Sequence, residues 1–239
     1  MRRAIATLVL LTAIGGSVDA RTDQPVLLSP AKTADAAHLV DIRSLAPDIT
    51  EDIKYAGNDN FVGTPVDGYL AAKCFLQRPA AEALARVERD LHMQHLRLKI
   101  WDCYRPARAV AHFVRWANDL TDQRTKPTHY PDLDKRVLLG DYIAPISGHS
   151  HGATVDLTLE QCAADNTHCA ALDMGTDFDF FDVRAHTDAP GITPLQRDNR
   201  QRLRAAMEHQ GFHNYPLEWW HYTLVPEPTP HTIYDVPVQ

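Results

Sequence analysis

The sequence has few of the features that mark several large classes of protein. It contains no long block of Lys and Arg, and its formal net charge is -7, which argues against a nucleic-acid partner. It has no internal repeats and no low-complexity tracts. After the first twenty residues no segment is long and apolar enough to cross a membrane, which takes about 20 residues. The remaining composition, 44% hydrophobic and 23% charged, is typical of a globular enzyme of one domain.

Two common metal motifs are also missing. No C-x-x-C pair exists, so a zinc site built from the four cysteines is not expected. The helical H-E-x-x-H pattern of many metallopeptidases is absent as well. Any metal site in this chain must therefore combine residues that lie far apart in the sequence.

The first twenty residues resemble a secretory signal peptide. Arg2 and Arg3 precede an apolar run, 4–14, and small or modest side chains follow before residue 21. The alternative is a buried N-terminal helix. We expect a signal peptide (1–20), a flexible lead-in (21–35) and one catalytic domain (36–239), with export to the periplasm.

The four cysteines agree with export, because an oxidising compartment permits disulfides and an even number leaves no obligatory spare thiol. Cys162 and Cys169 bracket a short polar loop and are the first choice for a pair. Cys74 and Cys103 would then pair by elimination. Four cysteines allow three pairings, and buried free thiols are the alternative.

The pattern of apolar residues predicts a mixture of helices and strands. Apolar residues recur at helical spacing in 79–95, 106–120 and 194–211, and Thr193 is placed to cap the third of these helices. Segments 96–101 and 155–160 alternate like strands, and 212–224 predicts a final strand or pair of strands. Because regular βαβ alternation is missing, we expect an α+β fold, a single domain with a mainly antiparallel sheet flanked by helices.

Two segments place a histidine and a carboxylate together in apolar, strand-like surroundings. They are SGHSHGATVDLTL (147–159) and LEWWHYTL (217–224). A charged group there costs free energy unless something neutralises it, and a divalent metal would do so. His149, Asp156 and His221 supply the three ligands of a typical catalytic zinc site. Glu218 could face the same cavity only if the strand is interrupted, because residues three apart on a regular strand point to opposite faces. Two unrelated structural histidines are the alternative.

At these residues the chain resembles the D-Ala-D-Ala dipeptidases of the vancomycin-resistance type, within the zinc D,D-peptidases. The family pattern S-x-H-x-x-G-x-A-x-D is matched from Ser147 to Asp156, with Thr154 in place of Ala, and E-W-W-H is intact at 218–221. Further matches are NFVGTPVDGY (60–69), WDCYRP (101–106), MGTDFDF (174–180) and NRQRLRAAME (199–208). The resemblance implies the zinc D,D-peptidase (hedgehog/DD-peptidase-like) architecture and covers about 36–238.

The resemblance also implies a role for each matching residue. One zinc ion per chain is held by His149, Asp156 and His221, and Glu218 is the general base and then the general acid. The other implied roles are an oxyanion contact for Arg105, a substrate-ammonium contact for Asp179 with Tyr55, and positions near the substrate for Ser147 and Tyr69. A guanidinium at a strand-to-helix junction independently suits Arg105 to a developing oxyanion. The implied reaction is hydrolysis of free D-Ala-D-Ala to two D-alanines, with water activated by zinc and Glu218.

Two positions depart from the family pattern. Gly148 replaces a common Ser, which puts a contact to the substrate carboxylate in doubt, and His151 replaces a common Arg and is not expected to bind the metal. The alternatives are a D,D-carboxypeptidase acting on peptidoglycan stem peptides, a zinc-containing binding module without turnover, and a structural exported protein. The sequence leaves the oligomeric state undetermined. Export favours a role in wall-dipeptide salvage over antibiotic resistance.

Overall fold

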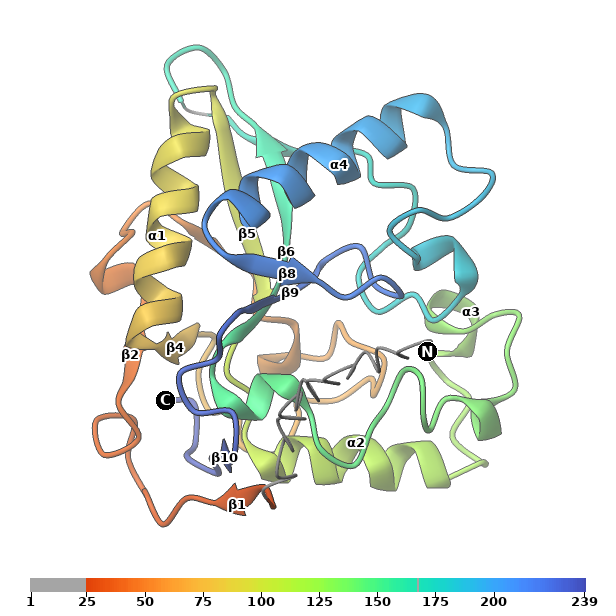
Figure 1. Cartoon of the computed structure of the whole chain (residues 1–239). Helices are drawn as coiled ribbons and strands as arrows, with labels where there is room; N and C mark the ends of the chain where they lie inside the picture. Colours follow the sequence, from red (N-terminus) through yellow and green to blue (C-terminus); the bar gives the residue numbers. More distant parts are fainter. Residues whose placement is uncertain (1–24, 167) are drawn as a thin grey trace, which may run out of the picture.

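The computed structural model describes residues 25–166 and 168–239 (Figure 1). The expected signal peptide, 1–20, lies outside the described residues. The described part of the lead-in, 25–35, contains a short strand, β1 (Leu27–Leu28), which pairs in parallel with β10 (Thr232–Ile233). This end of the lead-in is therefore tied to the C-terminal part of the chain.

The main sheet has the strand order β3-β5-β6-β9-β8, and β7 pairs with the far end of β6. Its strands are β3 (Thr50–Glu51), β5 (Leu96–Asp102), β6 (Thr154–Gln161), β7 (Ala170–Ala171), β8 (Phe212–Asn214) and β9 (His221–Leu224). Within this sheet only the β3–β5 pair is parallel. The α+β fold with one domain is confirmed, and the pairing is mainly antiparallel.

Two long helices pack on this sheet. The helix α1 (Arg78–His92) runs alongside β5 and contacts α4 (Pro194–His209), which packs against β8 (Figure 1). The helix α4 begins with the expected cap, because the Thr193 hydroxyl accepts from the Gln196 N–H and the Gln196 side chain accepts from the Thr193 N–H. Gly211, with φ of +90°, ends this segment as expected. The predicted helices in 79–95 and 194–211 are confirmed.

The remaining elements surround the lower end of the sheet in Figure 1. The predicted helix in 106–120 is confirmed as α2 (Ala107–Asn118), and a single turn, α3 (Lys126–His129), follows it. A separate two-stranded antiparallel sheet joins β2 (Leu39–Asp41) to β4 (Phe75–Gln77). Both disulfides pair as first expected, Cys162 with Cys169 and Cys74 with Cys103.

The central strand β6 is buried on both faces. Its apolar residues alternate with Asp156, Thr158 and Glu160, as the sequence indicates, but these three polar residues are also buried. The strand lies inside the sheet, with β5 on one side and β9 and β7 on the other, and the helix α4 also contacts it. The polar side chains of β6 therefore need partners within the protein.

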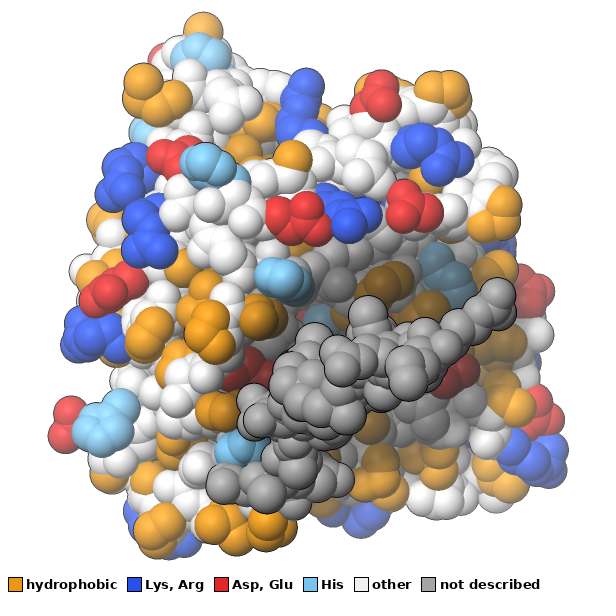
Figure 2. Space-filling model, in the orientation of Figure 1, with side chains coloured by type: hydrophobic (Ala, Val, Ile, Leu, Met, Phe, Trp, Pro, Cys, Tyr) orange, Lys and Arg blue, Asp and Glu red, His pale blue; other side chains and the backbone are white. Residues whose placement is uncertain are grey.

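The charged side chains on the outside are mixed in sign. Figure 2 shows acidic and basic side chains interspersed on the upper part of the face that carries α4, and Arg204 and Glu208 of that helix form an ion pair at 2.7 Å. Among the described residues no helix is long and apolar enough to cross a membrane.

Candidate active site

Three polar side chains from separate elements converge at the lower end of β6. Asp156 lies on β6, and His221 is the first residue of β9, directly opposite Asp156 in the antiparallel register. His149 comes from a 3-10 turn, η4 (Gly148–His151), in which the His149 N–H donates to the Ser147 hydroxyl at the start of the turn. Antiparallel pairing places opposite side chains next to each other, so the β6–β9 register alone brings Asp156 and His221 together.

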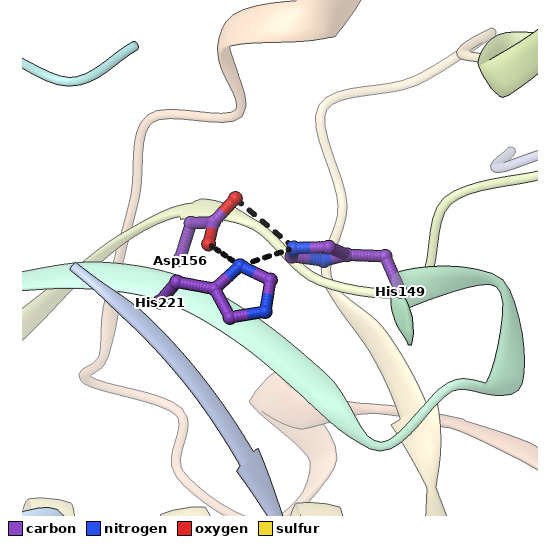
Figure 3. Close-up of side chains that lie close together, drawn as sticks. All are labelled: His149, Asp156 and His221. Carbon is purple, nitrogen blue, oxygen red and sulfur yellow. Dashed lines mark hydrogen bonds and ion pairs between the residues drawn. The ribbon is translucent and has the colours of Figure 1, made fainter. Parts of the chain in front are cut away.

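The nearest atoms of these three residues form a small triangle (Figure 3). His149 Nε2 lies 3.2 Å from Asp156 Oδ2, and His221 Nδ1 lies 3.1 Å from Asp156 Oδ1. The two ring nitrogens are 3.3 Å apart. Ligands about 2.0–2.1 Å from a tetrahedral zinc ion are separated by about 3.3 Å, so the spacing fits one such ion.

The hydrogen bond of the His149 ring and the ionisation of Asp156 also suit a metal. His149 Nδ1 lies 2.7 Å from the Cys103 carbonyl, so it carries the proton, and Nε2 faces the site with a lone pair. Burial works to raise the pKa of Asp156, but His149 and His221 together hold it below its usual value. The site therefore offers an ionised carboxylate and an imidazole nitrogen that faces it, which are ordinary kinds of metal donor.

Glu218 lies in the turn that joins β8 to β9. The His221 N–H donates to the Glu218 carbonyl at 3.2 Å, and this turn ends immediately before β9. The predicted break in the strand is confirmed, and it lets Glu218 Oε2 approach His221 Nδ1 to 3.5 Å. Burial raises the pKa of Glu218 to about 7, although the nearby His221 acts to lower it. Such a carboxyl group can accept and return a proton near neutral pH.

Arg105 enters the site from the segment between β5 and α2. Its Nε and one terminal nitrogen, Nη2, each lie 2.9 Å from Asp102 Oδ2, and Nη2 also lies 3.6 Å from Asp156 Oδ2. Burial acts to lower the pKa of Arg105, but the neighbouring Tyr55 and Asp102 raise it well above its usual value. The guanidinium is thus held as a fixed cation beside the group formed by His149, Asp156 and His221.

Asp102 is a site residue that the sequence reasoning missed. It is fully buried, accepts from the Tyr69 hydroxyl at 2.5 Å, and lies 3.5 Å from His149 Nδ1. Its position three residues before Arg105 was the available signal, because a carboxylate at the end of a strand can orient a neighbouring guanidinium.

Asp179 provides a second carboxylate on the cavity wall. It is 5% exposed, and the Tyr55 hydroxyl donates to its Oδ2 at 2.8 Å. Burial first, and then the charge of Asp156, raise the pKa of Asp179 well above its usual range. Among the described residues no Lys, Arg or His nitrogen forms an ion pair with this carboxylate, and Arg105 acts on it only through space.

A cavity of about 210 Å³ connects these groups. Eight of the nine residues proposed for the metal, the proton transfer or the substrate line it: Tyr55, Arg105, Ser147, His149, Asp156, Asp179, Glu218 and His221. Tyr69 does not line the cavity, because its hydroxyl is engaged behind the site by Asp102. As expected, His151 lies apart from His149, Asp156 and His221, and its Nδ1 is 3.1 Å from the Thr229 carbonyl.

A buried His-Asp-His group beside a carboxyl group and a fixed arginine, in one small cavity, is the arrangement of a metal-dependent hydrolase. Comparison with known proteins gives the family. Residues 35–239 match the Peptidase_M15 family, described as D-ala-D-ala dipeptidase. The chain belongs to this family of peptidases.

Curated relatives support the same assignment. The D-alanyl-D-alanine dipeptidase of Enterococcus faecium is 41% identical over 189 residues, which are 79% of this chain and 92% of the relative. The enzyme of the same name from Streptomyces coelicolor is 41% identical over 198 residues, 82% of this chain and 96% of the relative. The one from Escherichia coli is 34% identical over 191 residues, 80% and 86% of the two chains. The family resemblance inferred from the motifs is confirmed.

Proposed function

We propose that the protein is a zinc-dependent dipeptidase that hydrolyses D-Ala-D-Ala to two D-alanines, with the zinc D,D-peptidase (hedgehog/DD-peptidase-like) architecture. The observation that carries this proposal is the convergence of His149, Asp156 and His221 in a cavity whose wall also holds Glu218 and Asp179. One zinc ion held by the first three residues would polarise the scissile carbonyl group and a water molecule.

Glu218, Arg105 and Ser147 each have a separate role in the proposed reaction. Glu218 accepts a proton as the water oxygen forms a bond to the carbonyl carbon, and it returns that proton to the amine as the C–N bond breaks. Arg105, held by Asp102, stabilises the negative charge that develops on the carbonyl oxygen. Ser147, beside the Arg105 guanidinium at 3.4 Å, contacts the substrate near this end.

Asp179 sets the length of the substrate. Its buried carboxylate, held by the Tyr55 hydroxyl, pairs with the free ammonium group of the dipeptide. A stem peptide has an amide in that position and carries no charge there. It would leave the buried carboxylate unpaired, which disfavours the carboxypeptidase alternative.

The place of action belongs to the same proposal. The signal-peptide pattern of 1–20 supports export to the periplasm, where the enzyme would act on dipeptide released from the cell wall. Recovery of D-alanine is the corresponding role. Activity confined to cytoplasmic fractions would contradict this part of the proposal.

The decisive assay measures D-alanine release by purified protein, with and without a chelator. Substrates are D-Ala-D-Ala, L-Ala-L-Ala and a stem pentapeptide. We expect turnover of the first alone, loss of turnover with chelator, and recovery with zinc. Glu218→Gln should lower kcat by a factor of about 10³ or more while retaining zinc, and the exposed Glu208→Gln is the control. Wild-type turnover by Glu218→Gln would refute its role.

The proposed role of Asp179 can be tested against a control residue, Asp177, in the same loop. Asp179→Asn should mainly raise KM for the dipeptide, because it removes the charge that pairs with the substrate ammonium. Asp177→Asn, two residues earlier and exposed, should leave KM unchanged. Equal KM values for the two variants would show that Asp179 does not bind the ammonium group.

A further inference from the structure

The segment that follows β5 is attached to the segment that begins β4. Cys103 and Cys74 form a disulfide with a Cα separation of 5.2 Å, and both residues are buried. In the adjacent pair of residues, the Tyr104 N–H donates to the Phe75 carbonyl at 2.9 Å. A covalent bond and a hydrogen bond thus hold two consecutive residues of each segment side by side.

The peptide group between Cys103 and Tyr104 connects this junction to the metal-ligand group. Its N–H is the one that donates to Phe75, and its C=O accepts from His149 Nδ1 at 2.7 Å. The group lies between the end of β5 at Asp102 and the start of α2, so regular secondary structure does not fix its orientation. The disulfide lies directly beside this peptide group.

The turn that carries His149 is attached to the same two segments. The Arg105 N–H donates to the His149 carbonyl at 3.2 Å, and the Gln77 N–H of β4 donates to the Gly152 carbonyl at 2.7 Å. His149 is therefore held through its backbone and its ring by residues that the Cys74–Cys103 bond joins.

We infer that the Cys74–Cys103 disulfide is a positioning element for the metal ligand His149. By holding the Cys103 carbonyl in place, it keeps the proton on Nδ1 and aims the Nε2 lone pair at the metal. The inference rests on the proposed metal site. Loss of such an outer partner typically weakens metal binding by about 10- to 100-fold.

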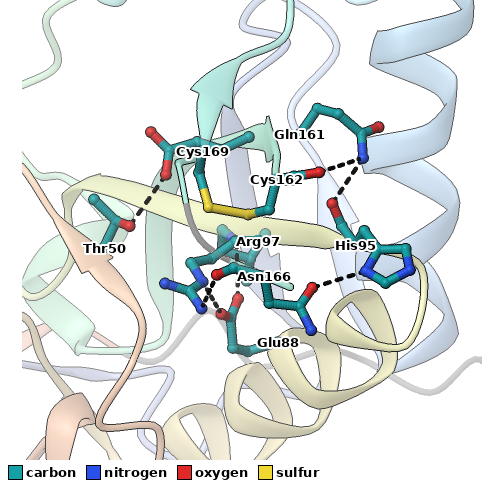
Figure 4. The surroundings of a disulfide bond; sticks show 10 residues. Thr50, Glu88, His95, Arg97, Gln161, Cys162, Asn166 and Cys169 are labelled. Atoms are coloured by element: carbon teal, nitrogen blue, oxygen red, sulfur yellow. Dashed lines mark hydrogen bonds and ion pairs between the residues drawn. A yellow bond between two sulfur atoms is a disulfide. The ribbon is translucent and has the colours of Figure 1, made fainter. Parts of the chain in front are cut away.

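The second disulfide is a matched control. Cys162 and Cys169 lie beyond the opposite end of β6, where Figure 4 shows them near Thr50, His95 and Asn166. Asp156 lies near the other end of that strand. Removing this bond also deletes one cross-link, but it leaves the Cys103–His149 contact intact.

The test compares the zinc dissociation constants of full-length wild type, C74S/C103S and C162S/C169S, measured by chelator competition on proteins whose far-UV circular dichroism is native. We expect a dissociation constant about 10- to 100-fold higher for C74S/C103S and within about twofold of wild type for C162S/C169S. Equal affinities in all three proteins would show that the Cys74–Cys103 bond does not position His149. Wild type that binds no zinc would instead overturn the proposed function itself.

A second measurement avoids any failure of C74S/C103S to fold. Folded, zinc-loaded C162S/C169S protein, which retains only the Cys74–Cys103 bond, is treated with a phosphine. Two electrons and two protons convert the disulfide to two thiols, and the phosphine takes an oxygen atom from water to become its oxide. The thiols are alkylated as they form. Zinc release that follows thiol formation and precedes any loss of circular dichroism supports the inference, and release only together with unfolding refutes it.

Discussion

Glu88 makes the free energy of unfolding of this protein fall as the pH rises from acidic to neutral. The side chain lies on the buried face of α1, 7% exposed, where its Oε2 accepts from the Leu98 N–H of β5 at 2.8 Å. Arg97 lies beside it, with Nε 3.7 Å from Glu88 Oε1 (Figure 4). Burial raises the pKa of Glu88 from 4.5 to about 7, although Leu98 and Arg97 both act to lower it.

The sign of the effect follows from the protons bound in each state. Between pH 4.5 and about 7 the folded protein keeps this proton and the unfolded chain does not, so stability falls as the pH rises. Since one pKa unit corresponds to about 1.4 kcal/mol, the whole interval represents about 3 kcal/mol. The contribution is complete below pH 4.5 and is lost above about pH 7.

Glu88→Gln tests this reasoning because it keeps the shape and an acceptor oxygen but carries no titrating proton. Urea unfolding of wild type and variant from pH 4.5 to 8 gives the difference in free energy of unfolding, in which the effects of other titrating groups cancel. We expect that difference to change by about 3 kcal/mol in favour of the variant as the pH rises. The exposed Glu82→Gln on the same helix is the control. Parallel stability curves for wild type and Glu88→Gln would refute the argument.

Three further substitutions test contacts around the site and the fold. Asp102→Asn should lower kcat by about 10²-fold and the free energy of unfolding by about 3 kcal/mol, because it breaks the buried pair with Arg105. Unchanged kinetics and unchanged thermal unfolding would contradict this. Arg200→Met should lower the free energy of unfolding by about 3 kcal/mol or more in urea. Arg200 is fully buried and donates to three backbone carbonyls, those of Met174, Arg184 and His186. A loss below about 1 kcal/mol would show that these carbonyls find other partners. Thr193→Ala should cost about 1 kcal/mol through the lost cap of α4, with Thr193→Ser as the rescue that should restore it.

Local patterns account for what could be predicted along the chain. The helical spacing of Ala83, Leu84, Val87 and Leu91 predicts α1, and these four residues are buried in the fold. The alternation in 96–101 likewise predicts β5, whose burial alternates along its length. Such segments are predictable because the periodicity of one helix or strand is contained in a few consecutive residues.

Part of the site could be predicted in the same way. The family motifs pointed to His149, Asp156 and His221 as candidate metal ligands, and residue spacing showed that Glu218 required a break before His221. The break is the turn before β9, so both side chains reach one cavity. The position of Tyr69 behind the cavity was not predicted. Nothing in its own segment indicates that its hydroxyl binds Asp102, 33 residues away.

The sequence by itself therefore determined the helices, the central strands, the donor residues and their family. The tertiary structure alone decided that Asp156 faces His221, that Asp102 holds Arg105, and that the Cys103 carbonyl meets His149 Nδ1. The physical reason is that these contacts depend on strand register and on the meeting of distant segments. Such arrangements arise from the packing of the whole domain, whereas propensity and periodicity act over neighbouring residues only.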